Sequence, residues 1–481
     1  MKFGKSAKKS FKWSFLIQIA NQVIGFVITI ILARILSPSD FGVIGIITIF
    51  INLSKKITDG GLAASLIRTN EIDDKDFSVV FYFNFVCSLF LYLILFFSSE
   101  FIAYFFKVPL VESLLKVYGI SIIISAFTIT QSVRLNKGLD FKTQFLILLP
   151  SLVISGGLGI VTAYLGLGVW SLVIKELSFA LFSALQLWFF SKWKPLLFFD
   201  WAIFKYHFSF AYKLVLADLI SQLFKDSYNA IISKSFSPAQ LGYFSRAKSM
   251  EELPSSIVFN TVNRVLFPML SLVQDSQEKI REVYSQIIQI VTFLVVPFLM
   301  LLNIVAEPLF VLLLTDKWLP AVPYFKILIL GGMIAPLQPY LLNICKVKGR
   351  SDLVLKLSLV EYAFIFLSML AIIPFGILGL LWGIVIATFA KLAVAMFYVS
   401  RLIDYSIHIQ LKDLREGFIL SFIGLLFIYA LEKSGLFLSL SFVSEIVIIS
   451  ILYYCFIFLI SLLLRFESIK QLKQLISKNG K

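Results

Sequence analysis

The sequence predicts an all-α integral membrane protein with about 14 transmembrane helices, arranged as two six-helix lobes related by an internal repeat plus two C-terminal helices. Three observations predict this fold. Of the 481 residues, 59% are hydrophobic and only 15% are charged. Apolar stretches long enough to cross a bilayer recur along the chain, and one short motif occurs twice. A soluble protein of this length would need far more polar surface.

The apolar stretches set the number of helices. A helix rises about 1.5 Å per residue, so about 20 apolar residues cross about 30 Å of hydrocarbon. Two of the stretches, 207–233 and 239–271, are the most polar, and 417–431 is the shortest. The predicted spans are 13–36, 41–58, 77–98, 110–132, 143–165, 168–190, 207–233, 239–271, 283–304, 323–345, 353–374, 376–399, 417–431 and 446–464.

Lysine and arginine are distributed unevenly between the two sides of these spans. If the N terminus is cytoplasmic, the inside segments hold 28 basic residues and the outside segments hold 4. Cytoplasmic loops carry such an excess in membrane proteins, so we expect both termini in the cytoplasm. The net charge of +15 then marks one membrane face and does not indicate a nucleic-acid partner. The first apolar run is too long for a signal peptide and is predicted to be the first membrane helix.

The repeated motif is Ser-Pro-x-x-x-Gly, at residues 37–42 and again at residues 237–242. Each copy lies between two apolar stretches. Such repeats are typical of transporters built from two homologous halves. We therefore expect an N-terminal lobe at 1–200, a C-terminal lobe at 201–404, and a third part at 405–481 with the last two spans and a basic tail.

A shift of 200 residues also superimposes polar positions of the helices before each motif. Gln18, Asn21, Gln22 and Thr29 fall on Asp218, Ser221, Gln222 and Asn229, at positions that share one helix face. Lys225 lies on the same face of the second copy. Polar side chains can join packed helices, but this correspondence favours a cavity lining that is neutral in one lobe and charged in the other.

Eleven basic residues fall inside the predicted spans. Such a residue costs about 2.5–3.5 kcal/mol at a helix centre, so by default it faces a cavity or a partner. Snorkelling to the interface is the alternative for those near a span end. A cationic cavity predicts an anionic cargo, and a pyrophosphate suits ammonium and guanidinium groups. The candidate substrate-binding residues are Lys225, Arg246, Arg34, Lys213, Arg264, Lys391, Gln22, Gln222 and Asn229.

The sequence lacks the motifs that are typical of several other functions. There is no nucleotide-binding GxxxxGK[ST] motif, every loop is short, and the only histidines, His207 and His408, support no HExxH or Ser-His-Asp pattern. Cys87, Cys345 and Cys455 have neither metal-ligand spacing nor a disulfide framework. We therefore expect no enzymatic activity, no cofactor and no metal. The membrane potential, worth about 2.3 kcal/mol per charge per 100 mV, favours export of an anion.

The chain resembles the polysaccharide-transporter branch of the multidrug/oligosaccharidyl-lipid/polysaccharide exporter superfamily, which includes the O-antigen and exopolysaccharide flippases. The resemblance rests on four segments, and it spans both lobes. They are LARILSPSDFG at 32–42, LGYFSRAKSM at 241–250, Leu253-Pro254 and NRVLFP at 263–268.

This resemblance implies a fourteen-helix transporter that flips polyprenyl-pyrophosphate-linked oligosaccharides across the bacterial plasma membrane by alternating access. It implies that Arg246, Arg34 and Arg264 hold the pyrophosphate, whereas Lys225 rests on its position alone. It also implies membrane lipids, a polysaccharide polymerase and chain-length proteins as partners. The alternatives are a cation-coupled multidrug exporter, which would need a carboxylate-rich ion site, and a membrane-bound glycosyltransferase or polymerase, which would need a large catalytic loop.

Overall fold

The computed structural model describes residues 2–69, 72–191, 193–272, 276–370, 372–434 and 441–468; their side chains are described except at 2–11, 257–272, 346, 351 and 373. Every regular element in these ranges is a helix. The predicted all-α class is therefore confirmed. The helices fall into two compact units, Met1–Ser245 and Arg246–Lys481.

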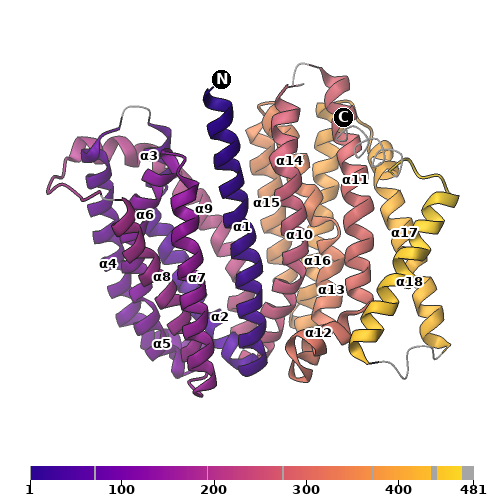
Figure 1. The fold of residues 1–481 in the computed structure, drawn as a ribbon, viewed down its shortest axis with the longest axis horizontal. Coiled ribbons are helices and arrows are strands. Elements are labelled where there is room, and N and C mark those ends of the chain that lie inside the picture. Colours follow the sequence, from indigo (N-terminus) through magenta and orange to yellow (C-terminus); the bar gives the residue numbers. More distant parts are fainter. Residues whose placement is uncertain are drawn as a thin grey trace. The chain divides into compact units, whose positions relative to one another are not determined.

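The first unit is a bundle of helices that run largely side by side (Figure 1). Its elements are α1 (Lys2–Ile35), α2 (Pro38–Asp59), α3 (Leu62–Arg68), α4 (Asp74–Phe106), α5 (Leu110–Tyr118), α6 (Ile120–Lys137), α7 (Phe141–Tyr164), α8 (Trp170–Ser191) and α9 (Trp201–Ser235), followed by the start of α10 (Pro238–Leu272). α7 packs on α8 and α1, and α6 packs on α4 and α8.

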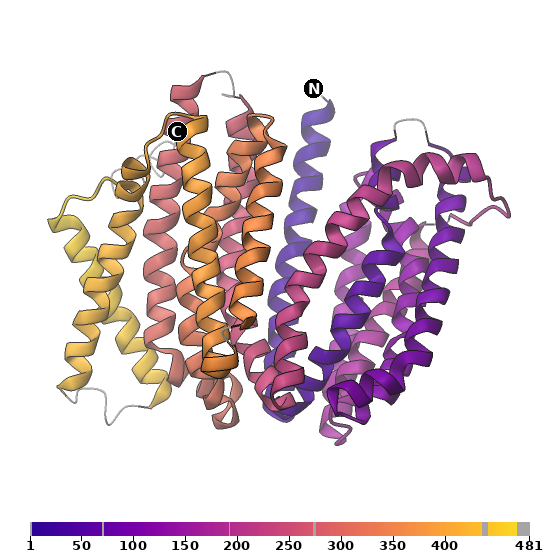
Figure 2. The same ribbon diagram turned by 180° about the vertical axis from the view of Figure 1, so that it is seen from behind.

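The helix α9 crosses the other helices of this unit at an angle (Figure 2). It packs on α2, α3 and α4. Apolar side chains fill this contact, because Leu62 and Leu66 of α3, Phe81 of α4 and Ala211 of α9 belong to one buried cluster. Burying such side chains removes apolar area from contact with polar groups and fixes where α9 lies on α3 and α4.

The second unit holds the rest of α10 and the later helices. They are α11 (Gln277–Ile304), α12 (Ala306–Leu314), η1 (Asp316–Ala321), α13 (Val322–Gly332), η2 (Ala335–Leu337), α14 (Gln338–Val347), α15 (Ser351–Leu370), α16 (Ile372–Leu402), α17 (Ile407–Lys433) and α18 (Phe442–Leu463). The last two helices form a pair, drawn in yellow in Figure 1, that packs on α11 and α12. Their contact buries Leu301, Ile428 and Tyr453.

Among the described residues, twelve segments are long and apolar enough to cross a membrane: Lys12–Ile35, Pro38–Arg68, Asp74–Phe106, Leu110–Lys137, Phe141–Tyr164, Trp170–Ser191, Gln277–Ile304, Asp316–Cys345, Asp352–Leu370, Pro374–Leu402, Ile407–Lys433 and Phe442–Leu463. Each coincides with one predicted span. The predicted seventh and eighth spans lie in α9 and α10, which are 35-residue helices but are not among the twelve. Charged residues such as Lys213, Asp218 and Lys225 make α9 too polar, so the count of fourteen is not confirmed.

The boundary between the compact units lies at 245/246, whereas the repeat predicts a lobe boundary at 200. The difference has a simple origin, since α9 packs on helices of the first unit. The compact units are defined by which helices pack together, whereas the predicted lobes are defined by the sequence repeat. The division into 1–200, 201–404 and 405–481 stays a prediction.

Both copies of the repeated motif start a helix in the same way. Before α2, the Ser37 backbone N–H donates to Asp40 Oδ2 at 2.9 Å, and the Asp40 N–H donates to Ser37 Oγ at 3.2 Å. Before α10, Ser237 and Gln240 exchange the equivalent bonds, each 3.3 Å long. In both copies a proline follows as the first helical residue. The motif is thus a capping box with a helix-starting proline, which explains why serine and proline recur.

The glycine of each motif copy lies against the proline of the other. A Cβ atom on Gly42 would lie 1.7 Å from the Pro238 carbonyl oxygen, and one on Gly242 would lie 1.9 Å from the Pro38 carbonyl oxygen. No side chain fits at such distances. The two helix starts therefore cross with their backbones in contact, and the reciprocity of the contact matches the repeat in the sequence.

Candidate functional site

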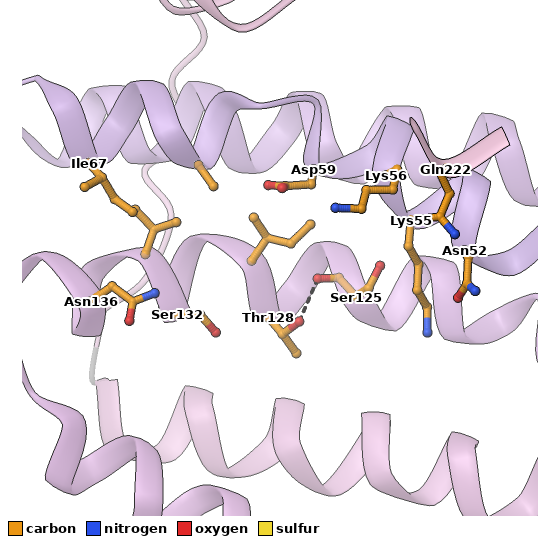
Figure 3. Close-up of a pocket in the computed structure, with 13 residues that line it drawn as sticks. Asn52, Lys55, Lys56, Asp59, Ile67, Ser125, Thr128, Ser132, Asn136 and Gln222 are labelled. Atoms are coloured by element: carbon orange, nitrogen blue, oxygen red, sulfur yellow. Dashed lines mark hydrogen bonds between the residues drawn. The ribbon is translucent and has the colours of Figure 1, made fainter. Parts of the chain in front are cut away.

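A polar pocket of about 600 Å³ opens among α2, α3, α6 and α9 in the first unit (Figure 3). It lies toward the end of this unit where α3 and the N terminus lie. Its lining consists of Asn52, Lys55, Lys56, Asp59, Ala63, Ile67, Ser125, Thr128, Ile129, Ser132, Val133, Asn136 and Gln222. Most of these side chains carry hydrogen-bonding groups, although the helices that present them are apolar.

Two lysines from successive positions of α2 supply the positive charge. Figure 3 shows Lys56 extended along the pocket toward Asp59, while Lys55 leaves α2 in a different direction. Lys56 Nζ lies 3.7 Å from Asp218 Oδ2 of α9. Lys55 Nζ lies 5.7 Å from the centre of the Tyr118 ring, and no carboxylate lies within 4 Å of it in the described part of the chain. Lys55 is therefore the ammonium group best placed to meet an anion.

Asp59 ends α2 and brings an acceptor to the same pocket. Its Oδ1 atom is buried and has no hydrogen-bond partner among the described residues. A buried carboxylate oxygen without a donor is costly. A donor group of a bound molecule or a water would remove that cost, so this oxygen is a natural contact for a hydroxyl-rich ligand.

The wall opposite α2 is a row of small polar side chains on α6. Ser125, Thr128, Ser132 and Asn136 recur at intervals of three or four residues, so they share one helix face. The hydroxyls of Ser125 and Thr128 donate to carbonyl oxygens of their own helix, at 2.6 and 2.8 Å. Their oxygens keep lone pairs for an incoming donor. The row therefore suits a ligand with many hydroxyl groups.

Of the residues predicted to bind substrate, the structure brings Gln222 to this pocket. Gln222 Nε2 donates to Asp226 Oδ2 at 2.8 Å. The other predicted residues of the first unit lie outside the pocket lining. Arg34, Lys213 and Lys225 are exposed on α1 and α9, and Gln22 and Asn229 are half-buried. Their role in substrate binding stays a prediction.

The structure also reveals site residues that the sequence reasoning missed, namely Lys55, Lys56 and Asp59. The predicted second span ends at residue 58, and Lys55 and Lys56 are counted among the 28 basic residues of the inside segments. In the structure α2 continues to Asp59 and ends at Gly60, whose left-handed φ of 57° closes the helix. The spacing of Asn52, Lys55, Lys56 and Asp59, at three, four and seven residues, was the available signal for a polar helix face.

A buried hydrogen-bond chain anchors α9 beside the pocket. His207 Nδ1 lies 2.8 Å from Ser65 Oγ of α3, and His207 Nε2 lies 2.9 Å from Asp76 Oδ1 of α4. The sequence spacing gave no indication of this Ser-His-Asp contact. His207 is fully buried and Ser65 is 3% exposed, so no substrate reaches the hydroxyl. The three side chains hold helices together. No group of three or more metal-ligating residues occurs in the described ranges.

Comparison with known proteins identifies the family. A family model described as "Polysaccharide biosynthesis protein" matches residues 31–323, more than half of the chain. The chain belongs to this polysaccharide biosynthesis family. The resemblance to the polysaccharide-transporter branch, proposed above from four motif segments, is thereby confirmed.

Similar proteins include three bacterial relatives. The chain is 24% identical over 339 residues to the succinoglycan biosynthesis transport protein ExoT of Rhizobium meliloti, covering 70% of this chain and 69% of that one. It is 24% identical over 360 residues to the teichuronic acid biosynthesis protein TuaB of Bacillus subtilis, covering 74% of each. It is 21% identical over 363 residues to the lipopolysaccharide biosynthesis protein WzxC of Escherichia coli, covering 75% and 74%.

Two solved structures share the fold. The lipid II flippase MurJ in an inward closed conformation matches with a TM-score of 0.73 at 16% identity, covering 94% of this chain and 99% of MurJ. An inward-facing multidrug transporter of the same exporter superfamily matches with a TM-score of 0.64 at 15% identity, covering 82% and 98%. The family member described here is thus a multi-pass membrane protein with the fold of this superfamily.

The remaining predicted site residues of this family member lie in the second unit. Arg246 is half-buried on α10. The Arg264 side chain lies outside the described residues. Lys391 of α16 forms an ion pair, since its Nζ lies 2.6 Å from Glu361 Oε2 of α15. The two side chains are 13% and 36% exposed. Within the described part of the chain, Lys391 therefore has a structural partner.

This pair predicts the outcome of substitutions at Lys391. Lys391→Met should destabilise the folded protein by about 2 kcal/mol, because a partly buried Glu361 carboxylate loses its counter-charge. Glu361→Gln in the same chain should restore part of that loss. Thermal unfolding of the purified single and double variants measures both effects. If the two single changes simply add, the pair makes no contribution to stability.

Proposed function

We propose that this protein moves a polyprenyl-pyrophosphate-linked oligosaccharide from the cytoplasmic to the outer leaflet of a bacterial plasma membrane by alternating access. The observation that carries the proposal is the pocket among α2, α6 and α9. It combines two lysines with a row of hydroxyl and amide groups inside a bundle of membrane-spanning helices, in a chain of the polysaccharide biosynthesis family.

Each part of such a substrate has a counterpart. Ammonium groups bind phosphate as point charges, so Lys55 and Lys56 suit the pyrophosphate. Hydroxyl and amide side chains such as Ser132 and Asn136 suit the sugars, which both donate and accept hydrogen bonds. The apolar outer surface of the helices suits the polyprenyl chain in lipid. With both termini in the cytoplasm, the pocket would lie near the cytoplasmic ends of α2 and α6, on the side where lipid-linked sugars would be loaded.

The proposal involves movement without chemical change, so it names no catalytic residue. Export of two negative charges would gain about 4.6 kcal/mol from a potential of 100 mV, at about 2.3 kcal/mol per charge. The multidrug transporter with this fold supports the alternative function, a cation-coupled multidrug exporter. The lysines argue against it, because Lys56 already neutralises Asp218 and Lys55 would repel a cationic drug. The polymerase and chain-length partners stay predictions.

The test is the double variant Lys55→Ala/Lys56→Ala, produced in the native host. Loss of a charge-assisted hydrogen bond is worth about 1.5–3 kcal/mol, so surface polysaccharide should fall at least about tenfold. Lys142→Ala is a matched control, because Lys142 is exposed at the start of α7 and is not part of the pocket lining. Membrane levels of all variants are measured by immunoblot.

Two results would contradict the proposal. One is full polysaccharide output from the double variant at normal membrane level. The other is normal output from a deletion strain that instead becomes sensitive to cationic drugs, which would favour the multidrug exporter.

A further inference from the structure

The polar pocket of the first unit presents different groups along its length. Figure 3 shows Lys55 and Gln222 at one end of the pocket. Ile67 and Asn136 lie at the other end, and the Asp59 carboxylate lies between the two ends. A ligand that fills the pocket therefore meets an ammonium group with one part and a carboxylate with another.

The spacing on α2 fits a pyrophosphate followed by one sugar. Asp59 lies four residues after Lys55, which is about 6 Å along a helix that rises about 1.5 Å per residue. A pyranose ring covers a similar length. The polar row of α6 continues past Asp59 to Ser132 and Asn136, so a sugar chain has hydrogen-bonding partners in that direction. With the pyrophosphate on Lys55, the first sugar therefore lies beside Asp59.

The Asp59 carboxylate is not used up by contacts within the protein. Its Oδ1 atom has no hydrogen-bond partner among the described residues. The groups that act on the carboxylate are Lys56, Asp218 and the Ala63 backbone N–H. Lys56 is shared, because its Nζ lies 3.7 Å from Asp218 Oδ2. Among the residues that the structure describes, no lysine or arginine nitrogen lies within 4 Å of the Asp59 carboxylate.

Such a carboxylate treats neutral and acidic sugars differently. A neutral sugar brings hydroxyl groups, which donate hydrogen bonds to carboxylate oxygens. An ionised uronic acid brings a second carboxylate at its exocyclic carbon, and an ionised carboxylate only accepts hydrogen bonds. The two negative charges also repel each other more strongly in a partly buried pocket than in bulk water. Asp59 is therefore suited to one class of sugar and opposes the other.

We propose that Asp59 is a specificity-determining residue that restricts the first sugar of the substrate to one without an acidic group. This inference rests on the transport function proposed above and names the class of substrate: a neutral hexose or an N-acetylated amino sugar next to the pyrophosphate. Lys55 binds the pyrophosphate that all such substrates share, whereas Asp59 selects among the sugars attached to it. The restriction does not extend to sugars further along the chain.

The test compares the binding of two matched probes to the purified full-length protein in detergent by isothermal titration calorimetry. The probes are glucose and glucuronic acid, each linked through its anomeric oxygen to farnesyl diphosphate. They differ only in the exocyclic group, which is a hydroxymethyl in one and a carboxylate in the other. The wild type should bind the glucose probe at least about tenfold more tightly, because neighbouring carboxylates repel by at least the corresponding 1.4 kcal/mol.

The variant Asp59→Asn removes the negative charge and keeps the shape and one accepting oxygen. It should bind the glucuronic acid probe at least about tenfold more tightly than the wild type does, and the glucose probe within about threefold of the wild type. Misfolding cannot produce such a gain of binding. Asp140→Asn is the matched control, because Asp140 is an exposed acid before α7 and is not part of the pocket lining. This control should keep the wild-type preference.

The outcomes separate the two proposals. If neither probe binds to the wild type, the transport of pyrophosphate-linked sugars fails, and the inference fails with it. If the wild type binds both probes equally well, or if Asp59→Asn keeps the wild-type preference, the transport function stands and Asp59 does not select the sugar.

Discussion

Replacement of Gly42 or Gly242 with valine is expected to abolish the folded protein. A Cβ atom at either position would lie within 2 Å of a proline carbonyl oxygen of the other motif copy. That oxygen belongs to the backbone at a helix start, so it cannot rotate away as a side chain could. Moving it would separate α2 from α10. The cost should be at least about 3 kcal/mol, at the upper end for overpacked sites.

The measurement is the amount of monodisperse protein in detergent extracts, followed by thermal unfolding of what remains. Gly25→Ala on α1 and Gly157→Ala on α7 are the controls, because no atom beyond the neighbouring residues of the same helix lies within 4 Å of a Cβ atom at either position. Alanine also has the higher helix propensity, so both controls should match or exceed the wild type. Wild-type stability of Gly42→Val would show that the two helix starts do not cross in contact.

The repeat illustrates what the sequence could and could not predict. The shared Ser-Pro-x-x-x-Gly motif at 37–42 and 237–242 predicted two related halves, and the capping bonds show that both copies have the same local structure. The sequence comparison could not show that the copies touch each other. A repeat establishes that two segments have the same local structure, whereas their contact depends on how the helices before and after them pack. Only the backbone distances at Gly42 and Gly242 reveal it.

The predicted cavity lining and the observed pocket share one residue. Gln222 was expected on a cavity-lining face and lies in the pocket, but the search for charge favoured residues in the middle of apolar stretches, such as Lys225. Lys55 and Lys56 lie at the polar end of α2, where hydropathy does not separate a loop from a last helical turn. The helix end is set by Gly60, and the pocket by the way α6 and α9 pack beside it.

Side-chain contacts between residues far apart in the sequence cannot be predicted from local sequence patterns. Lys391 was predicted to face substrate because it lies deep in a span, and the structure places Glu361 beside it. Both positions were visible as charges in the sequence, 30 residues apart. Which charges meet depends on the rotation of α15 and α16 about their axes. The same holds for His207, whose partners lie 142 and 131 residues away.

The substitution Asp413→Ala is expected to cause the largest loss of stability in the second unit. Asp413 of α17 accepts hydrogen bonds from Ser285 and Gln289 of α11 and from Tyr405. Alanine would leave these donors without an acceptor in a buried place. Each orphaned donor costs about 1–3 kcal/mol, so the total should reach about 3–5 kcal/mol after partial relaxation. Thermal and denaturant unfolding of the purified protein measures the change.

Two further variants decide whether the loss comes from the hydrogen bonds. Asp413→Asn keeps the shape and one accepting oxygen, but its amide must face one of the donors, so its loss should be about half that of alanine. Glu432→Ala removes an exposed acid from the far end of the same helix and should change stability by less than about 0.5 kcal/mol. Equal losses in Asp413→Asn and Asp413→Ala would mean that charge, and not the number of acceptors, stabilises this contact.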